Sequence, residues 1–239
     1  MKTTLVSSTI AERGNKPIES TIGNYFELLK PRVMSLAIFT ALIGQLMSDS
    51  QKNITLVCIS LLSIAIGAGA AGCINMWYER DIDSIMLRTK KRPIPAGKIL
   101  ADDALTLGVV LAVMAVIILT LSSNYLSGLL LASSILFYIF IYTIWLKKRT
   151  AYNIVIGGAA GALPPIIGWT SVDGSLSSLP IIMFLIIFLW TPPHFWALSL
   201  YNSDDYKRAK LPMLPLVLGE QATRKQIVYY SFVLYISSL

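Results

Sequence analysis

The chain has 239 residues, of which 55% are hydrophobic and only 14% are charged, with a mean hydropathy of +0.65. Because each membrane crossing needs about 20 apolar residues, this composition excludes an ordinary water-soluble domain and predicts a polytopic membrane protein. The net charge of +7 does not indicate nucleic-acid binding, since the basic residues lie in the gaps between apolar runs rather than on one soluble face.

Successive apolar runs predict an all-α bundle of transmembrane helices. We expect spans over residues 33–47, 54–78, 104–121, 125–146, 153–169 and 179–201, followed by a seventh run that opens near Ile227. The seventh run has about thirteen residues, too few to cross a bilayer, so we expect the native chain to continue beyond Leu239. Pro164 and Pro165 predict a bend or break in the fifth span.

Basic residues fall almost entirely on one side of this predicted bundle. With the N-terminus inside, 19 of the 20 lysines and arginines lie in inner segments, and only Lys52 lies in an outer loop. This bias predicts that residues 1–24 form a cytosolic tail, that residues 25–239 form the membrane domain, and that the charged loops after the second and sixth spans face the cytosol. The tail mixes acids with bases and resembles neither a cleavable signal nor a transit peptide, which favours a bacterial cytoplasmic membrane over a mitochondrial one.

The segment from Asn75 to Lys98 is the most charged part of the chain. Asn75, Glu79 and Asp83 recur every four residues, so on a helix they form one polar stripe that continues the second span. Solvated charges at a helix end are the alternative, but acids near hydrocarbon are costly unless they have a role. Oxygen ligands from successive turns suit Mg²⁺, and the bases that follow suit phosphate oxygens. We therefore expect Asn75, Glu79 and Asp83 to hold a metal ion, with Arg88 and Arg92 beside them as catalytic residues that bind diphosphate.

These residues resemble a known motif. The string NMWYERDID, followed by Arg88, Arg92 and Pro93, is similar to the NDxxDxxxD and RxxxRP motifs of the UbiA superfamily of intramembrane prenyltransferases. Glu79 stands where the superfamily has Asp, and Met76 stands where it has a second-position Asp. Residues 142–169 and 190–215 resemble the protohaem IX farnesyltransferase (haem O synthase) branch, in which PHF, DY and LPxLP segments replace the second DxxxD motif.

The resemblance implies a UbiA-like fold, with nine helices in the full-length protein. It implies transfer of a farnesyl group from farnesyl diphosphate to a vinyl group of haem b, with Mg²⁺ as cofactor and haem b as substrate. The product, haem O, would serve haem–copper oxidases, so haem A synthase or the oxidase assembly machinery are candidate partners. Further candidate substrate-binding residues are Arg80, Lys148, Lys207, His194, Asp205, Tyr206 and Trp196. The single histidine, His194, could contact haem, carry a proton or simply pack in the core.

Two other function classes remain open on the sequence alone. A UbiA-type aromatic prenyltransferase of quinone or chlorophyll biosynthesis would share the first motif, and a DxxxD string in the second loop would favour it. A membrane transporter could also place acids and a histidine in its spans, but it would not need the clustered bases of RTKKRP.

Overall fold

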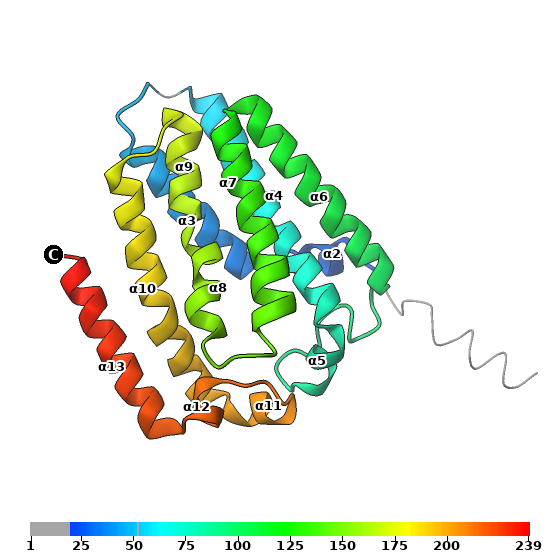
Figure 1. Cartoon of the computed structure of the whole chain (residues 1–239). Helices are drawn as coiled ribbons and strands as arrows, with labels where there is room; N and C mark the ends of the chain where they lie inside the picture. The colour runs from blue at the N-terminus through cyan, green and yellow to red at the C-terminus, as the bar shows by residue number, and fades with distance from the viewer. Residues whose placement is uncertain (1–19, 52) are drawn as a thin grey trace, which may run out of the picture.

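The computed structural model describes residues 20–51 and 53–239, and these form one helical bundle (Figure 1). No strand occurs in the described residues, which confirms the predicted all-α class. Lys52 and most of the predicted tail lie outside them. The helices are α2 (Ile22–Leu28), α3 (Pro31–Met47), α4 (Ile54–Tyr78), α5 (Arg80–Ile85), α6 (Ala101–Ser122), α7 (Tyr125–Leu136), the π-helix η1 (Phe137–Leu146), α8 (Asn153–Ala162), α9 (Pro164–Asp173), α10 (Ser178–Tyr201), α11 (Ser203–Arg208), α12 (Leu214–Val217) and α13 (Glu220–Ser237).

Five helical segments of the described chain are long and apolar enough to cross a membrane. They coincide with the predicted second to sixth spans: Ile54–Tyr78, Ala101–Ser122, Tyr125–Leu146, Asn153–Asp173 and Ser178–Tyr201. The predicted first span is α3, an apolar helix of 17 residues. The predicted seventh run lies in α13, which begins before Ile227, at Glu220, directly after Gly219 with a φ of 85°. Whether this run completes a crossing stays a prediction.

Two of the helix boundaries come from special backbone positions. Lys30 has a φ of 52°, in the left-handed region, and it separates α2 from α3, whose first residue is Pro31. The predicted break in the fifth span is confirmed, because α8 ends at Ala162 and α9 begins at Pro164. The π-helical end of the fourth span was not predicted. Its wider turn is visible in the bond from the Lys147 N–H to the Tyr142 carbonyl, at 3.0 Å.

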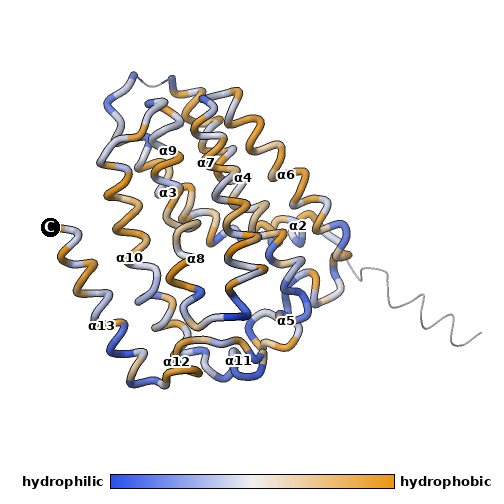
Figure 2. Tube along the Cα trace, in the orientation of Figure 1, coloured by the Kyte–Doolittle hydropathy of each residue, from blue (hydrophilic) through white to orange (hydrophobic). Residues whose placement is uncertain are grey.

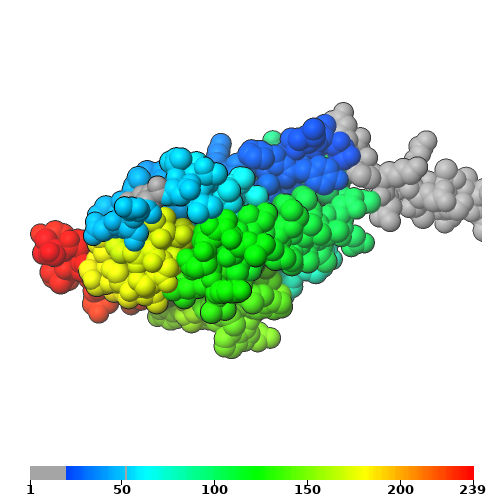
Figure 3. Space-filling view, turned by 90° about the horizontal axis from the view of Figure 1, so that it is seen from above, coloured from blue at the N-terminus to red at the C-terminus, as the bar shows by residue number. Residues whose placement is uncertain are grey.

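Close backbone packing holds α3 against α9. A Cβ on Gly44 would overlap the Pro165 carbonyl, and a Cβ on Gly168 would overlap the Ala41 carbonyl. Each helix therefore presents a glycine to the backbone of the other, which is the kind of contact that small residues allow in membranes. Seen from above, the N-terminal helices (blue to cyan) lie along one side of the bundle and the green and yellow helices along the other (Figure 3).

Hydrophilic residues gather at one end of the bundle. The sides of the long helices are mostly apolar, whereas α5, α11 and the start of α13 form a hydrophilic rim, which is at the bottom in Figure 2. We call residues 79–98, 147–150 and 202–210 the charged end. Both predicted motif loops therefore lie at the same end of the molecule, as the topology from charge counting required.

Candidate functional site

Asn75, Glu79 and Asp83 lie on one nearly continuous helical path. Glu79 joins α4 to α5, and backbone bonds from the Glu79 N–H to the Asn75 carbonyl (3.0 Å) and from the Asp83 N–H to the Glu79 carbonyl (2.8 Å) keep the helical register. All three side chains are buried. The sequence thus predicted the stripe correctly as a geometric feature, and the stripe faces the interior of the charged end.

Both acids of the stripe form ion pairs. Lys147 Nζ lies 2.5 Å from Glu79 Oε1, and Arg92 Nη1 lies 2.6 Å from Asp83 Oδ2. Carboxylates at this burial need such partners, because an unpaired buried charge is strongly unfavourable. Arg92 was predicted to lie beside the stripe and it does, whereas Lys147 was not predicted.

Lys30 completes a group of polar side chains around the stripe. We call Lys30, Asn75, Glu79, Asp83, Arg92 and Lys147 the polar cluster. Its Nζ donates a hydrogen bond of 2.5 Å to Asn75 Oδ1, and the Asn75 amide donates to Thr143 Oγ1 at 3.0 Å. Burial, together with the nearby Arg92 cation, lowers the pKa of Lys30 to about 7. Three bases and two acids therefore meet around the stripe, which leaves one net positive charge when Lys30 is protonated.

Aromatic rings from η1 border the same cluster. The rings of Tyr138 and Tyr142 have centroids 5.4 Å apart, and Lys147 Nζ lies 5.9 Å from the centroid of the Tyr142 ring. Tyr206 of α11 is near enough to interact electrostatically with Tyr142. Electron-rich ring faces beside a cation site can also attract a carbocation.

The donor set of the stripe fits Mg²⁺ in chemistry, since it offers two carboxylates and an amide oxygen. No group of three His, Cys, Asp or Glu side chains able to hold a metal occurs among the described residues, so other ligands would come from water or diphosphate. Met76, where the family motif has an acid, packs in an apolar cluster with Leu28 and Cys73. A bound ion would compete with Lys147 and Arg92 for the carboxylates and release these bases for phosphate oxygens.

Asp205 joins the second charged loop to the first. Its Oδ1 accepts the Leu87 N–H at 3.1 Å and the Arg208 guanidinium at 2.8 Å, and its Oδ2 accepts the Arg88 N–H at 3.1 Å. Burial alone would raise the pKa of Asp205, but these backbone hydrogen bonds and the Arg208 cation lower it below the ordinary value. The two loops, 118 residues apart in sequence, are therefore in direct contact.

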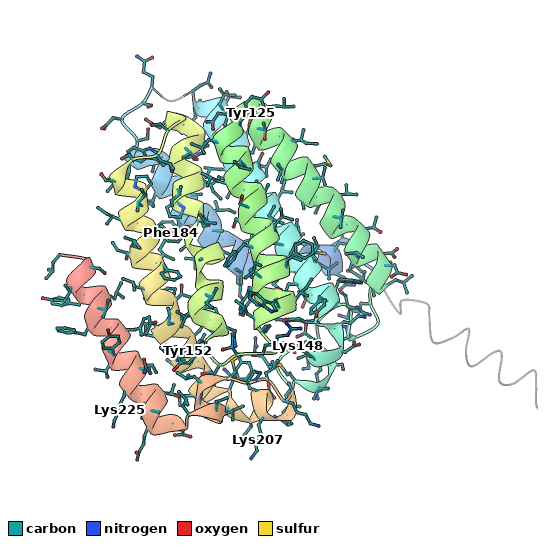
Figure 4. The ribbon with its side chains drawn as sticks, in the orientation of Figure 1. Tyr125, Lys148, Tyr152, Phe184, Lys207 and Lys225 are labelled. Carbon is teal, nitrogen blue, oxygen red and sulfur yellow. The ribbon has the colours of Figure 1, made fainter. Side chains whose placement is uncertain are left out.

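Three predicted substrate-binding bases lie outside the polar cluster. Arg80 donates to the Trp77 carbonyl at 2.9 Å and lies 5.4 Å from the centroid of its ring. Lys148 is exposed and lies 4.9 Å from the centroid of the Tyr78 ring. Lys207 is exposed at the outer edge of α11, pointing away from the bundle (Figure 4). Their roles in substrate binding stay predictions.

The predicted residues of α10 lie on different faces of that helix. Trp196 is fully buried, packs with Ala151 and Leu214, and meets the Tyr230 ring edge-on at 5.2 Å. His194 is half-buried, and its ring stacks on that of Trp190 with centroids 4.3 Å apart. Trp196 therefore has a packing role in this structure, whereas His194 is accessible to a ligand.

Comparison with known proteins identifies the family to which this fold belongs. Residues 37–239 match the profile of the UbiA prenyltransferase family. The chain belongs to this family. It is 55% identical over 227 residues to "Protoheme IX farnesyltransferase 2" of Mesorhizobium japonicum, covering 95% of this chain and 72% of that protein. It is 54% identical over 236 residues to "Protoheme IX farnesyltransferase" of Methylorubrum populi, covering 97% and 74%.

Solved structures show the same fold at low sequence identity. A UbiA homolog from Archaeoglobus fulgidus, bound to DMAPP and Mg²⁺, superposes with a TM-score of 0.76 at 19% identity, covering 90% of this chain and 76% of that one. A digeranylgeranylglyceryl phosphate synthase superposes with a TM-score of 0.73, also at 19% identity, covering 91% and 76%. These neighbours support the UbiA-like fold that the motif implied.

Proposed function

We propose that this protein transfers a farnesyl group from farnesyl diphosphate to a vinyl group of haem b, forming haem O. The observation that carries the proposal is the 55% identity, over 95% of the chain, to a relative named as a protohaem IX farnesyltransferase. The buried stripe of Asn75, Glu79 and Asp83 with its surrounding bases supplies the chemistry that a diphosphate leaving group needs.

The polar cluster would bind the diphosphate of the donor. Lys147, Arg92 and Lys30 would pass from the stripe to phosphate oxygens when the donor enters, because charge-assisted hydrogen bonds to phosphate are strong. Mg²⁺, held by Asn75, Glu79 and Asp83, would neutralise negative charge on the diphosphate. These interactions strengthen as the C–O bond of the donor breaks, since the departing diphosphate gains charge.

The remaining steps need no covalent link to the protein. The farnesyl cation is attacked by the vinyl group of haem b, a new C–C bond forms, and water adds to the resulting cation with loss of a proton. Tyr138 and Tyr142 border the polar cluster and would stabilise the allylic cation through their ring faces. The helix bundle would shield both apolar substrates from bulk water until the bond has formed.

The charged end would face the cytosol of a bacterial cytoplasmic membrane, with the tail of residues 1–24 on the same side. The distribution of lysine and arginine supports this orientation. Haem O would then leave towards haem A synthase or the oxidase assembly machinery.

Product identification tests the proposal. Membranes containing the protein are incubated with labelled farnesyl diphosphate and either haem b or 4-hydroxybenzoate, and the labelled product is identified by mass. We expect a farnesylated hydroxyethyl porphyrin in the incubation with haem b and no labelled product in the incubation with 4-hydroxybenzoate. Labelled 4-hydroxybenzoate would refute the proposal in favour of an aromatic prenyltransferase, and diphosphate release without either adduct would refute both.

A further inference from the structure

One face of α10 carries side chains that remain accessible in the bundle. Trp190, His194, Leu198 and Tyr201 follow at spacings of four, four and three residues, which places them on one side of a helix. Tyr201 is 89% exposed, whereas Trp196, on another face, is 1% exposed. We call Trp190, His194, Leu198 and Tyr201 the α10 stripe.

The α10 stripe ends at a groove in the charged end. The groove has a volume of about 370 Å³ and lies between the end of α10, α11 and the loop after α5. Arg88 and Arg208 line it together with Tyr201, Asp204 and Asp205. Asp205 already accepts two backbone N–H groups and the Arg208 guanidinium. The exposed Asp204 is therefore the acid of the groove that has free acceptor capacity. The groove also offers the guanidinium groups of Arg88 and Arg208.

Asp205 contacts both arginines of the groove, one through its backbone and the other through its side chain. It accepts the backbone N–H of Arg88 and pairs directly with the guanidinium of Arg208. The Arg88 side chain forms no hydrogen bond or ion pair within the part of the chain that the structure describes. The Arg208 side chain is 46% exposed and uses one of its nitrogens, so donors remain for a ligand. Arg88 and Arg208 thus line one groove, and both have guanidinium donors that remain free for a ligand.

We infer that the α10 stripe and this groove bind the tetrapyrrole acceptor, with its carboxylates on Arg88 and Arg208 and its macrocycle along the stripe. The inference rests on the proposed function and adds the acceptor's position. The twelve residues from Trp190 to Tyr201 span about 16 Å along the helix axis, which is room for a flat macrocycle. Arginine binds carboxylates through paired, charge-assisted hydrogen bonds, and imidazole is a common ligand of haem iron, so His194 stands where an iron ligand could act.

This arrangement separates the two arginines of the RxxxRP segment. Arg92 points to Asp83 and the donor's diphosphate site, whereas Arg88 lines the acceptor groove. The loop between them therefore borders both substrates, and Asp205 positions it from α11. Donor and acceptor would approach from opposite sides of one short segment.

The test compares haem b with its dimethyl ester, in which both carboxylates are uncharged. Each is titrated into purified protein in detergent micelles without farnesyl diphosphate, and binding is followed by the absorbance of the haem. We expect the wild type to prefer the diacid by about tenfold or more for each arginine. The double variant Arg88→Gln/Arg208→Gln should lose this preference, while Lys210→Gln, an exposed base of the charged end outside the groove, should keep it. His194→Ala should change the absorbance spectrum of bound haem while leaving the preference intact.

Two results would overturn the inference. One is equal binding of diacid and diester by the wild type, and the other is a double variant that weakens both ligands by the same factor. The wild-type comparison needs no variant, so it tests the inference even if the double variant does not fold. If haem O forms from haem b but the diacid preference is absent, the acceptor lies elsewhere and the proposed function stands. If neither haem binding nor haem O formation occurs, both fail.

Discussion

Lys147 and Lys148 are adjacent in sequence but differ in environment, and substituting each tests the geometry of the site. Lys147 pairs with Glu79 at 2.5 Å, with side chains only 17% and 4% exposed. Lys148 is exposed over the Tyr78 ring. Breaking a buried pair costs about 3–5 kcal/mol, whereas an exposed cation–π contact contributes about 0.5–1 kcal/mol. Because Lys147 keeps some solvent contact, we expect Lys147→Gln to reduce the free energy of unfolding by about 3 kcal/mol and Lys148→Gln by at most about 1 kcal/mol.

The two variants are compared by denaturant unfolding in detergent micelles and by kcat/KM for farnesyl diphosphate. A double variant, Lys147→Gln/Glu79→Gln, removes both charges and should recover part of the lost stability, because no buried charge is left unpaired. It should remain inactive if Glu79 holds the metal. Equal losses of stability in the two single variants would show that Lys147 is not the partner of Glu79, and the description of the polar cluster would be wrong.

Four further results are expected. Asp83→Ala should lower turnover at least about 100-fold in a correctly inserted protein, since it removes a proposed metal ligand and the partner of Arg92; wild-type rates would remove the metal assignment. Chelation should abolish farnesyl transfer, and added Mg²⁺ should restore it; activity in chelator would refute a metal requirement. Gly168→Ala should destabilise the protein by about 1–3 kcal/mol through overlap with α3, whereas Gly161→Ala, which meets no neighbouring atom, should be neutral or slightly stabilising in thermal unfolding. Asp205→Asn should raise the KM for haem b about tenfold without changing the Mg²⁺ requirement; a raised Mg²⁺ requirement would instead mark Asp205 as a metal ligand.

The sequence predicted those parts of the fold that depend on local composition. Span positions follow from runs of apolar residues, and the break before Pro164 follows from proline chemistry. The stripe of Asn75, Glu79 and Asp83 was predictable because four-residue spacing alone places side chains on one helical face. These features need no knowledge of how distant segments meet.

The partners of the stripe depend on tertiary contacts and were not predictable in the same way. Lys30 itself has the left-handed backbone conformation that separates α2 from α3, and from there its side chain reaches Asn75. At the end of the π-helix, Lys147 rather than Lys148 pairs with Glu79. Both lysines lie at span ends, where the sequence indicated only their contribution to orientation. The contact between Asp205 and the Arg88 backbone also joins segments whose sequences carry no shared signal.

The π-helix η1 places an extra residue in the helix that borders the polar cluster. A π-turn holds about one more residue than an α-turn, so deleting a single residue from Phe137–Leu146 would return one turn to ordinary α-helical geometry. Because the deleted residue is the extra one that the wider turn accommodates, the residues after the deletion would keep their orientation relative to Glu79. A one-residue deletion within η1 could therefore leave the ion pair between Lys147 and Glu79 in place, whereas the same deletion in a regular α-helix would rotate Lys147 by about 100°.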